Sequence, residues 1–150
     1  MSNYLIHLTK NIDFDMEIND RITIISGDSS TGKTFIINMM NIIIKMNKVN
    51  SVPKPLVPSD FIVCSNEDET FKINNAHHKV IFIDRYDIFS KDVKNMINKK
   101  MSQQDNTWII MSRGTDIKCY GSIALKVLKS RIENGKRVLY LADYLGAKFI

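Results

Sequence analysis

The stretch GDSSTGKT, residues 27–34, is the most informative part of the chain for its fold. It follows a nearly continuous apolar run, RITIIS at residues 21–26, which is typical of a strand buried in a parallel sheet. It leads into a segment from residue 33 to about 45 whose apolar side chains cover most of a helical surface. We therefore expect a buried strand, a short polar loop and a deeply buried helix in direct succession.

The residue types of this loop suit the binding of a polyphosphate. Glycines at 27 and 32 allow the backbone to turn tightly, so that successive N–H groups can point inwards. A helix that begins at Lys33 adds unpaired amides and the positive end of its dipole. Lys33 can reach the β- and γ-phosphates, and the Thr34 hydroxyl can ligate Mg²⁺. The predicted nucleotide-binding residues are Gly27, Asp28, Ser29, Ser30, Thr31, Gly32, Lys33 and Thr34.

The remaining pattern predicts one α/β domain over residues 1–150, a usual length for a domain. Strands are expected at residues 4–8, 14–18, 60–65, 79–84 and 107–112, a helix at 88–103 and a loop at 47–59. The sequence Asn134-Gly135 supplies the positive φ angles of a tight turn, so residues 123–132 and 136–142 are expected to form an antiparallel hairpin. The expected sheet is mostly parallel, with this C-terminal β-hairpin added.

The loop motif and its position resemble the P-loop NTPase superfamily, over residues 21–112. The resemblance implies a three-layer P-loop NTPase fold. It also implies an acidic residue at the end of a buried strand that holds Mg²⁺, usually through water. Asp84 closes an apolar run and matches this Walker B pattern, although a carboxylate there could instead cap the following turn or helix. Thr34 and Asp84 are therefore the expected metal ligands, with ATP and Mg²⁺ as the expected cofactors.

The order of the predicted strands resembles the additional-strand branch of these ATPases, which includes RecA-like and AAA-type proteins. In that branch the fourth strand lies between the first and third and ends in a polar sensor of the γ-phosphate. Ser112 ends the corresponding strand here. Arg113 beside it could sense the γ-phosphate within the chain or reach a neighbouring subunit as an arginine finger. The alternative interpretation of both residues is an ordinary turn at the end of a strand.

The residue that would orient the attacking water departs from the family pattern. Many members have a glutamate directly after the Mg²⁺ aspartate, whereas Arg85 follows Asp84 here. RecA-like proteins place a glutamate after the second strand, where this chain has Glu67 and Glu69; a solvated acidic loop is the alternative. Asp87 is a weaker substitute because its side chain is shorter. The expected catalytic residues are Lys33, Glu67, Glu69 and Arg113.

These residues predict a slow Mg²⁺-dependent ATPase that couples its nucleotide state to a protein partner or a second copy of the chain. A nucleotide-gated interaction module without significant turnover is an alternative. A second alternative is a nucleoside monophosphate kinase, because Asp84-Arg85-Tyr86 resembles the Asp-Arg-Tyr/His triplet of thymidylate-kinase-like enzymes. Those enzymes also need an arginine-bearing lid, whereas residues 118–136 resemble a hairpin. GTPases are disfavoured because no Asn-Lys-x-Asp motif occurs.

Composition adds weaker constraints on partners and location. Lys and Arg outnumber Asp and Glu by 21 to 16, which favours anionic partners slightly. The predicted hairpin has a basic edge that indicates either a solvated sheet edge or contact with nucleic acid. Its residues are Lys126, Lys129, Arg131, Lys136 and Arg137. No apolar run reaches the ~20 residues of a membrane span, so we expect a cytoplasmic protein in which Cys64 and Cys119 are reduced thiols.

Overall fold

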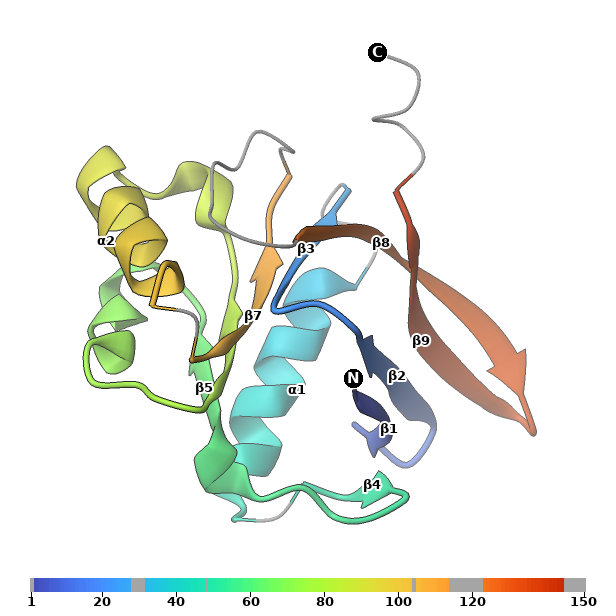
Figure 1. Ribbon diagram of the computed structural model, residues 1–150. Helices are drawn as coiled ribbons and strands as arrows, with labels where there is room; N and C mark the ends of the chain where they lie inside the picture. The colour runs from blue at the N-terminus through green and yellow to red at the C-terminus, as the bar shows by residue number, and fades with distance from the viewer. Residues whose placement is uncertain (1, 28–31, 48, 104, 114–122, 145–150) are drawn as a thin grey trace.

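One sheet of nine strands organises the chain (Figure 1). The structure is a computed structural model, and it describes residues 2–27, 32–47, 49–103, 105–113 and 123–144. The strands are β1 (Ser2–His7), β2 (Ile12–Ile18), β3 (Ile22–Ser26), β4 (Ser51–Val52), β5 (Phe61–Cys64), β6 (Val80–Ile83), β7 (Thr107–Met111), β8 (Ile123–Glu133) and β9 (Lys136–Asp143). The helices are α1 (Lys33–Lys45), α2 (Lys91–Met101) and the 3-10 segments η2 (Pro58–Asp60), η3 (Glu67–Ile73) and η4 (Tyr86–Ile88).

The strands lie in the order β4-β1-β2-β9-β8-β3-β7-β6-β5. The five from β8 to β5 are parallel to one another, and β7 lies between β3 and β6, the position expected of the fourth strand. Three pairings are antiparallel, namely β8 with β9, β1 with β2, and β1 with β4. The parallel pairing of β2 with β9 joins the N-terminal strands to the hairpin.

The prediction of a three-layer fold with a mostly parallel sheet is wrong. The sheet is mixed and curled, and the described residues form only two α-helices. The physical reason is connectivity: β1 and β2, and likewise β8 and β9, are antiparallel neighbours that a short turn can join, whereas parallel strands need a long crossover. Both antiparallel pairs extend the sheet without adding helices to cover it.

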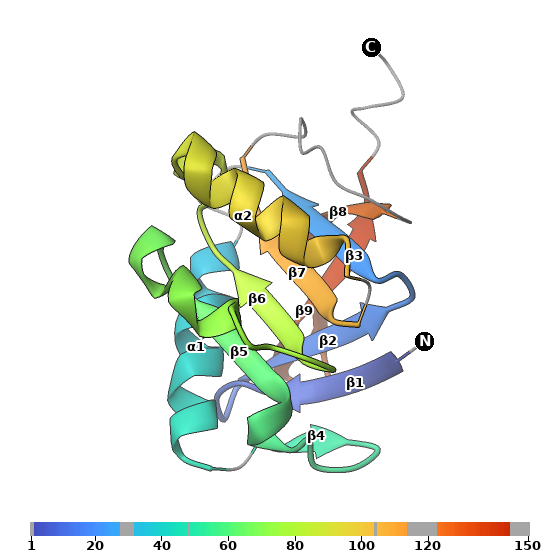
Figure 2. The same ribbon diagram turned by 60° about the vertical axis from the view of Figure 1, so that its left-hand side comes forward.

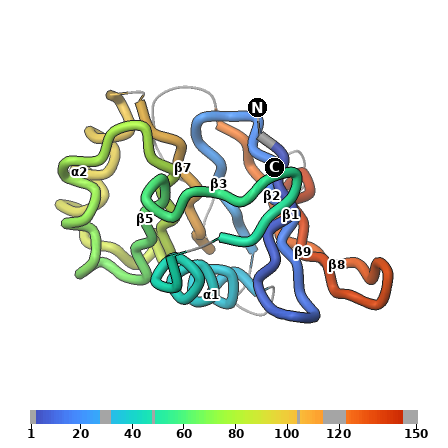
Figure 3. Tube along the Cα trace, turned by 90° about the horizontal axis from the view of Figure 1, so that it is seen from below, coloured from blue at the N-terminus to red at the C-terminus, as the bar shows by residue number. Residues whose placement is uncertain are grey.

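Each α-helix buries an apolar stripe against one face of the sheet (Figures 2 and 3). Ile36, Ile37 and Met40 of α1 share a core with Phe14 of β2 and with side chains of β5, β6, β7, β8 and β9, because the sheet curls towards this helix. On the opposite face, Ile97 and Met101 of α2 pack with side chains of β3, β6 and β7. Burying such large aliphatic side chains contributes roughly 1.5–3 kcal/mol each, so these two cores fix both helices on the parallel strands.

Most of the local predictions are confirmed. The helix predicted from residue 33 to about 45 is α1, and the hairpin turns at Asn134 and Gly135, whose φ angles are 53° and 78°. The expected second helix is shorter than predicted: α2 begins after Ser90, whose Oγ accepts a hydrogen bond of 3.3 Å from the Val93 amide. Residues 47–59 contain the short strand β4, which the prediction of a plain loop missed.

Candidate nucleotide-binding site

The two glycines of the loop motif have the backbone geometry that the motif requires. Gly27 has a φ of 119° and Gly32 a φ of 100°, values that side-chain-bearing residues rarely adopt. Gly32 caps α1, and its carbonyl accepts a 3.1 Å hydrogen bond from the Ile36 amide. The middle of the predicted phosphate loop lies outside the described residues; these positions are Asp28, Ser29, Ser30 and Thr31. The described ends of the loop therefore lie at the end of β3 and at the start of α1.

Lys33 is the first residue of α1, and its side chain turns back towards the loop. Its ammonium donates a hydrogen bond to the Gly27 carbonyl, and the residue is only 5% exposed. A buried cation at a helix N-terminus lies where the dipole already favours an anion. This arrangement concentrates positive potential at the carboxyl end of β3.

Thr34 and Asp84 meet although they lie far apart in the sequence. The Thr34 Oγ1 donates to the Asp84 Oδ2 over 3.1 Å. Asp84 follows β6 and is 4% exposed, and its other oxygen accepts a 2.9 Å hydrogen bond from the Arg85 amide. The hydroxyl and carboxylate are hard oxygen donors of the kind that Mg²⁺ accepts alongside retained waters.

Ser112 and Arg113 lie at the end of the central strand β7. The Ser112 amide donates to the Ile25 carbonyl at 3.0 Å, so its backbone continues the pairing of β7 with β3. Its hydroxyl is buried and has no hydrogen-bond partner among the described residues. Arg113 is exposed, and its amide donates to the Asp87 Oδ1 at 3.2 Å. An unsatisfied buried hydroxyl beside a cationic side chain suits an anionic ligand better than a closed core.

These residues line one open pocket of about 310 Å³ at the carboxyl ends of the parallel strands. This is the usual location of ligands in parallel sheets. Its lining residues are Lys33, Thr34, Asp84, Arg85, Asp87, Ile88, Met111, Ser112 and Arg113. The structure thus brings together five of the predicted site residues, Lys33, Thr34, Asp84, Ser112 and Arg113.

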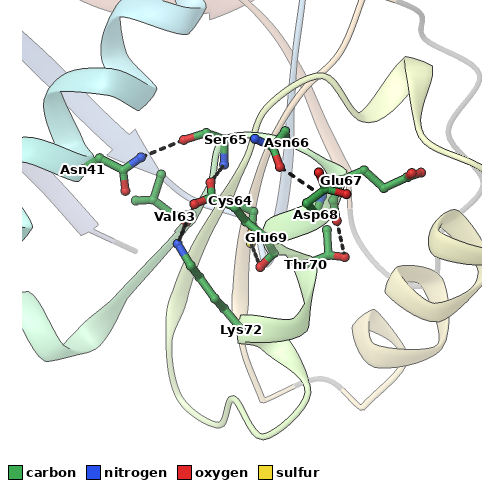
Figure 4. A network of polar contacts seen from close by, with 10 residues as sticks. All are labelled: Asn41, Val63, Cys64, Ser65, Asn66, Glu67, Asp68, Glu69, Thr70 and Lys72. Carbon is green, nitrogen blue, oxygen red and sulfur yellow. Dashed lines mark hydrogen bonds and ion pairs between the residues drawn. The ribbon is translucent and has the colours of Figure 1, made fainter.

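Glu67 and Glu69 do not line this pocket, and both carboxylates have structural partners; Figure 4 shows those of Glu69. The Glu69 carboxylate accepts a 2.6 Å hydrogen bond from the Ser65 amide and pairs with the Lys72 ammonium at 3.1 Å. Glu67 accepts from the Ser90 amide at the start of α2. Burial raises the pKa of Glu69, but the Ser65 and Lys72 contacts outweigh it, so the pKa lies below its usual range. The two glutamates therefore fix η3 against its neighbours, away from the five grouped residues.

The pocket also contains residues that were not among the expected binding, metal or catalytic residues. Arg85 has a left-handed backbone with φ of 60°, which turns the chain directly after Asp84. The Ile88 side chain is 71% exposed although it lines the pocket. Asp87, considered only as a weaker substitute, is the second carboxylate of the lining. The available signal was position, since these residues immediately follow the strand that ends before Asp84.

The basic edge of the hairpin is largely neutralised within the described residues. Lys126 pairs with Asp143 at 2.7 Å, Arg131 with Asp15 at 3.2 Å, and Lys136 with Asp13 at 3.3 Å. Arg131 also contacts Glu133 at 2.9 Å. The pairs with Asp15 and Asp13 connect the hairpin to β2, and all four pairs engage cations that could otherwise contact nucleic acid.

Comparison of the sequence with models of known protein families gave no match, and neither did comparison with curated proteins. Among the helices that the structure describes, none has the length and apolarity needed to cross a membrane. The case for a function therefore depends on the geometry of the pocket.

Proposed function

We propose that this protein binds ATP with Mg²⁺ in the 310 Å³ pocket and hydrolyses it slowly. The observation that carries the proposal is the 3.1 Å contact between Thr34 and Asp84 beside Lys33 at the start of α1. This contact places a hydroxyl, a carboxylate and an ammonium at one helix N-terminus, where a triphosphate and its metal need all three.

The donor set fits a metal that keeps most of its own water. Among the described residues, no three His, Cys, Asp or Glu side chains gather closely enough to enclose a metal. Mg²⁺ does not need such a cage, because it is commonly held by one or two protein oxygens, phosphate oxygens and water. Thr34 and Asp84 would hold it, and the bound ion would neutralise charge on the β- and γ-phosphates.

The chain's own residues would bind the phosphates and orient the attacking water. Lys33 and the loop amides would bind the phosphate oxygens, and Ser112 would donate its unpaired hydroxyl to the γ-phosphate. Asp87 would orient the attacking water, since it lines the pocket and its Oδ1 is fixed by the Arg113 amide. Glu67 and Glu69, the water-orienting residues predicted from the sequence, have other partners.

Binding is tested by calorimetry with ATP and Mg²⁺ on the full chain. Lys33→Ala should weaken binding by about 10- to 100-fold, since hydrogen bonds to charged groups contribute about 1.5–3 kcal/mol. Lys45→Ala is the matched control, because Lys45 is exposed at the opposite end of the same helix. Equal affinities of wild type and Lys33→Ala would overturn the proposal.

Turnover is tested by phosphate release under saturating ATP. Asp87→Asn should abolish the slow release, whereas Glu67→Gln and Glu69→Gln should retain it. Release that persists in Asp87→Asn would remove the assigned role of Asp87.

The nucleotide-gated interaction module is the second candidate function. It is favoured by one observation, that both predicted water-orienting glutamates are engaged outside the pocket. Release by the wild type of less than about one phosphate per hour, near the intrinsic rate of small GTPases, would support the module. Formation of diphosphate from dTMP and ATP would instead support the kinase alternative, in which Arg85 meets the acceptor phosphate.

A further inference from the structure

We propose that a second pocket, next to the nucleotide pocket, binds a phosphate-bearing ligand. This second pocket measures about 220 Å³ and lies between the first turns of α2, η4 and the end of β7. It shares Asp87 and Ser112 with the nucleotide pocket. The inference depends on the proposed function only for the identity of the molecule in the neighbouring pocket.

One face of α2 supplies hydrogen-bond donors to this cavity. Lys91, Lys94, Asn95 and Asn98 all line it, and they are spaced i, i+3, i+4 and i+7, which places them on one side of a helix. Apolar residues of α2, including Ile97, are buried in the core instead. This polar face of α2 lines a cavity, so its side chains can contact a ligand bound there.

Lys94 and Asn98 are held in position by Tyr86 and Asp87. The Lys94 ammonium donates to the Asp87 carbonyl at 3.1 Å and lies 5.6 Å from the centre of the Tyr86 ring. The Tyr86 hydroxyl donates to the Asn98 Oδ1 at 3.2 Å. This bond turns the Asn98 oxygen towards Tyr86, and the Asn98 amide nitrogen, which can only donate, offers a donor to a ligand.

The Ser112 hydroxyl, on the wall that the two pockets share, also points to a ligand. Ser112 is 2% exposed, and its hydroxyl has no partner among the described residues although the residue lines the cavity. Buried hydroxyls are nearly always hydrogen-bonded in folded proteins. A ligand oxygen from either pocket would supply the missing partner.

The lining selects an oxyanion. It carries two ammonium groups, from Lys91 and Lys94, against one carboxylate, Asp87, and the Oδ1 of that carboxylate already accepts from the Arg113 amide. Phosphate oxygens accept hydrogen bonds and match such a set of donors. The cavity is smaller than the roughly 300–1,000 Å³ of pockets for whole small molecules, so it suits free phosphate or the phosphate group of a monoester.

The test is an NMR titration of the ¹⁵N-labelled full chain, saturated with a non-hydrolysable ATP analogue and Mg²⁺. Inorganic phosphate and phenyl phosphate are added in separate series, with chloride at equal ionic strength as the control. The side-chain amides of Asn95 and Asn98 report on the cavity. We expect saturable shifts that weaken at least about tenfold in Lys91→Gln/Lys94→Gln, since charge-assisted contacts are the strong ones. Lys99→Gln, an exposed lysine of the same helix outside the cavity, should leave the affinity unchanged.

The outcomes separate this proposal from the proposed function. Non-saturable shifts equal to those of chloride, or equal weakening in Lys99→Gln, would overturn it, and so would a response abolished by the ATP analogue. Tighter binding of phenyl phosphate identifies a monoester, and equal or tighter binding of inorganic phosphate identifies the free ion. The same titration of nucleotide-free Lys33→Ala keeps the two proposals apart. A saturable response there that depends on Lys91 and Lys94 supports the second site even if the wild type binds no ATP.

Discussion

The Thr34 hydroxyl donates a hydrogen bond of 3.1 Å to the Asp84 carboxylate, joining two residues that are fifty positions apart in the chain. Thr34 lies in the first turn of α1, and Asp84 follows β6, so the contact ties α1 to the strand on the far side of β7. The Asp84 amide is also fixed, because it donates to the Cys64 carbonyl at 2.9 Å. The two oxygens are thereby positioned before any ligand arrives, which lowers the ordering cost of binding.

Asp84→Asn should abolish the Mg²⁺-dependent part of ATP affinity, because the amide keeps the shape of the carboxylate and loses its charge. We expect an affinity lower by about 10- to 100-fold in Mg²⁺ and nearly unchanged in EDTA. Thr34→Val should lower the affinity in Mg²⁺ in the same way, whereas Thr34→Ser, which keeps the hydroxyl, should retain the wild-type affinity. Calorimetry in Mg²⁺ and in EDTA measures the difference, with Asp68→Asn as an exposed control outside the pocket. Full Mg²⁺ dependence in Asp84→Asn would contradict the assigned role.

Glu69→Gln should change how stability depends on pH. Burial raises the pKa of Glu69, but the Ser65 amide and Lys72 together lower it by more than burial raises it. The pKa in the folded protein therefore lies below the ordinary value. The charged carboxylate therefore stabilises the fold above the ordinary pKa of about 4.3, and this contribution is lost as pH falls through the lower folded pKa.

The difference in free energy of unfolding between wild type and Glu69→Gln should be constant from about pH 5.5 upwards and shrink below about pH 4. Urea unfolding followed by the fluorescence of Trp108, the single tryptophan, measures it. Glu17→Gln removes an exposed carboxylate as a control. A difference independent of pH between 3 and 7 would show that the Glu69 contacts do not hold in solution.

The local structure and the grouped site residues could be predicted because their signals are local. The apolar run at 22–26, the glycine-bounded loop and the sequence Asn134-Gly135 each restrict the backbone near themselves. Asp84 and Ser112 were predictable for a further reason: both follow strands of the parallel half, whose carboxyl ends lie at one edge of the sheet.

The mixed sheet and the roles of the glutamates could not be predicted, because both depend on distant partners. Nothing near Phe14 indicates that it pairs with Leu139, yet this register joins β2 to β9 and makes one sheet of both hairpins. Likewise, the spacing of Glu67 matches a water-orienting residue, but its carboxylate accepts a hydrogen bond from the Ser90 amide, 23 positions away, at the start of α2. Such choices are made by tertiary contacts between segments that look similar in the sequence.

Cys64 should be almost inert towards thiol reagents in the folded protein. Burial raises its pKa to about 12, and the nearby Lys72 offsets this only in part. At pH 8 the thiolate fraction is then about one in ten thousand, and only the thiolate reacts. Cys119 lies outside the described residues and is replaced by serine for the experiment, so that Cys64 is the single thiol. Reaction with Ellman's reagent should be at least about 1,000-fold slower in buffer than in denaturing urea, and comparable rates would contradict the buried position.

Gly135→Ala should destabilise the protein through the backbone alone. Gly135 has a φ of 78°, and a Cβ built there meets no atom within 4 Å, so the cost comes from the left-handed conformation and is about 1–2 kcal/mol. Asn134, with a φ of 53°, supplies the control: Asn134→Gly accepts this conformation and should change stability by less than about 1 kcal/mol. Urea unfolding measures both variants. Because the turn lies at the tip of the projecting hairpin, ATP affinity should stay unchanged (Figure 1). Wild-type stability of Gly135→Ala would mean that the two strands are not joined by the two-residue turn, and the register from Lys126 opposite Asp143 to Glu133 opposite Lys136 would have to shift.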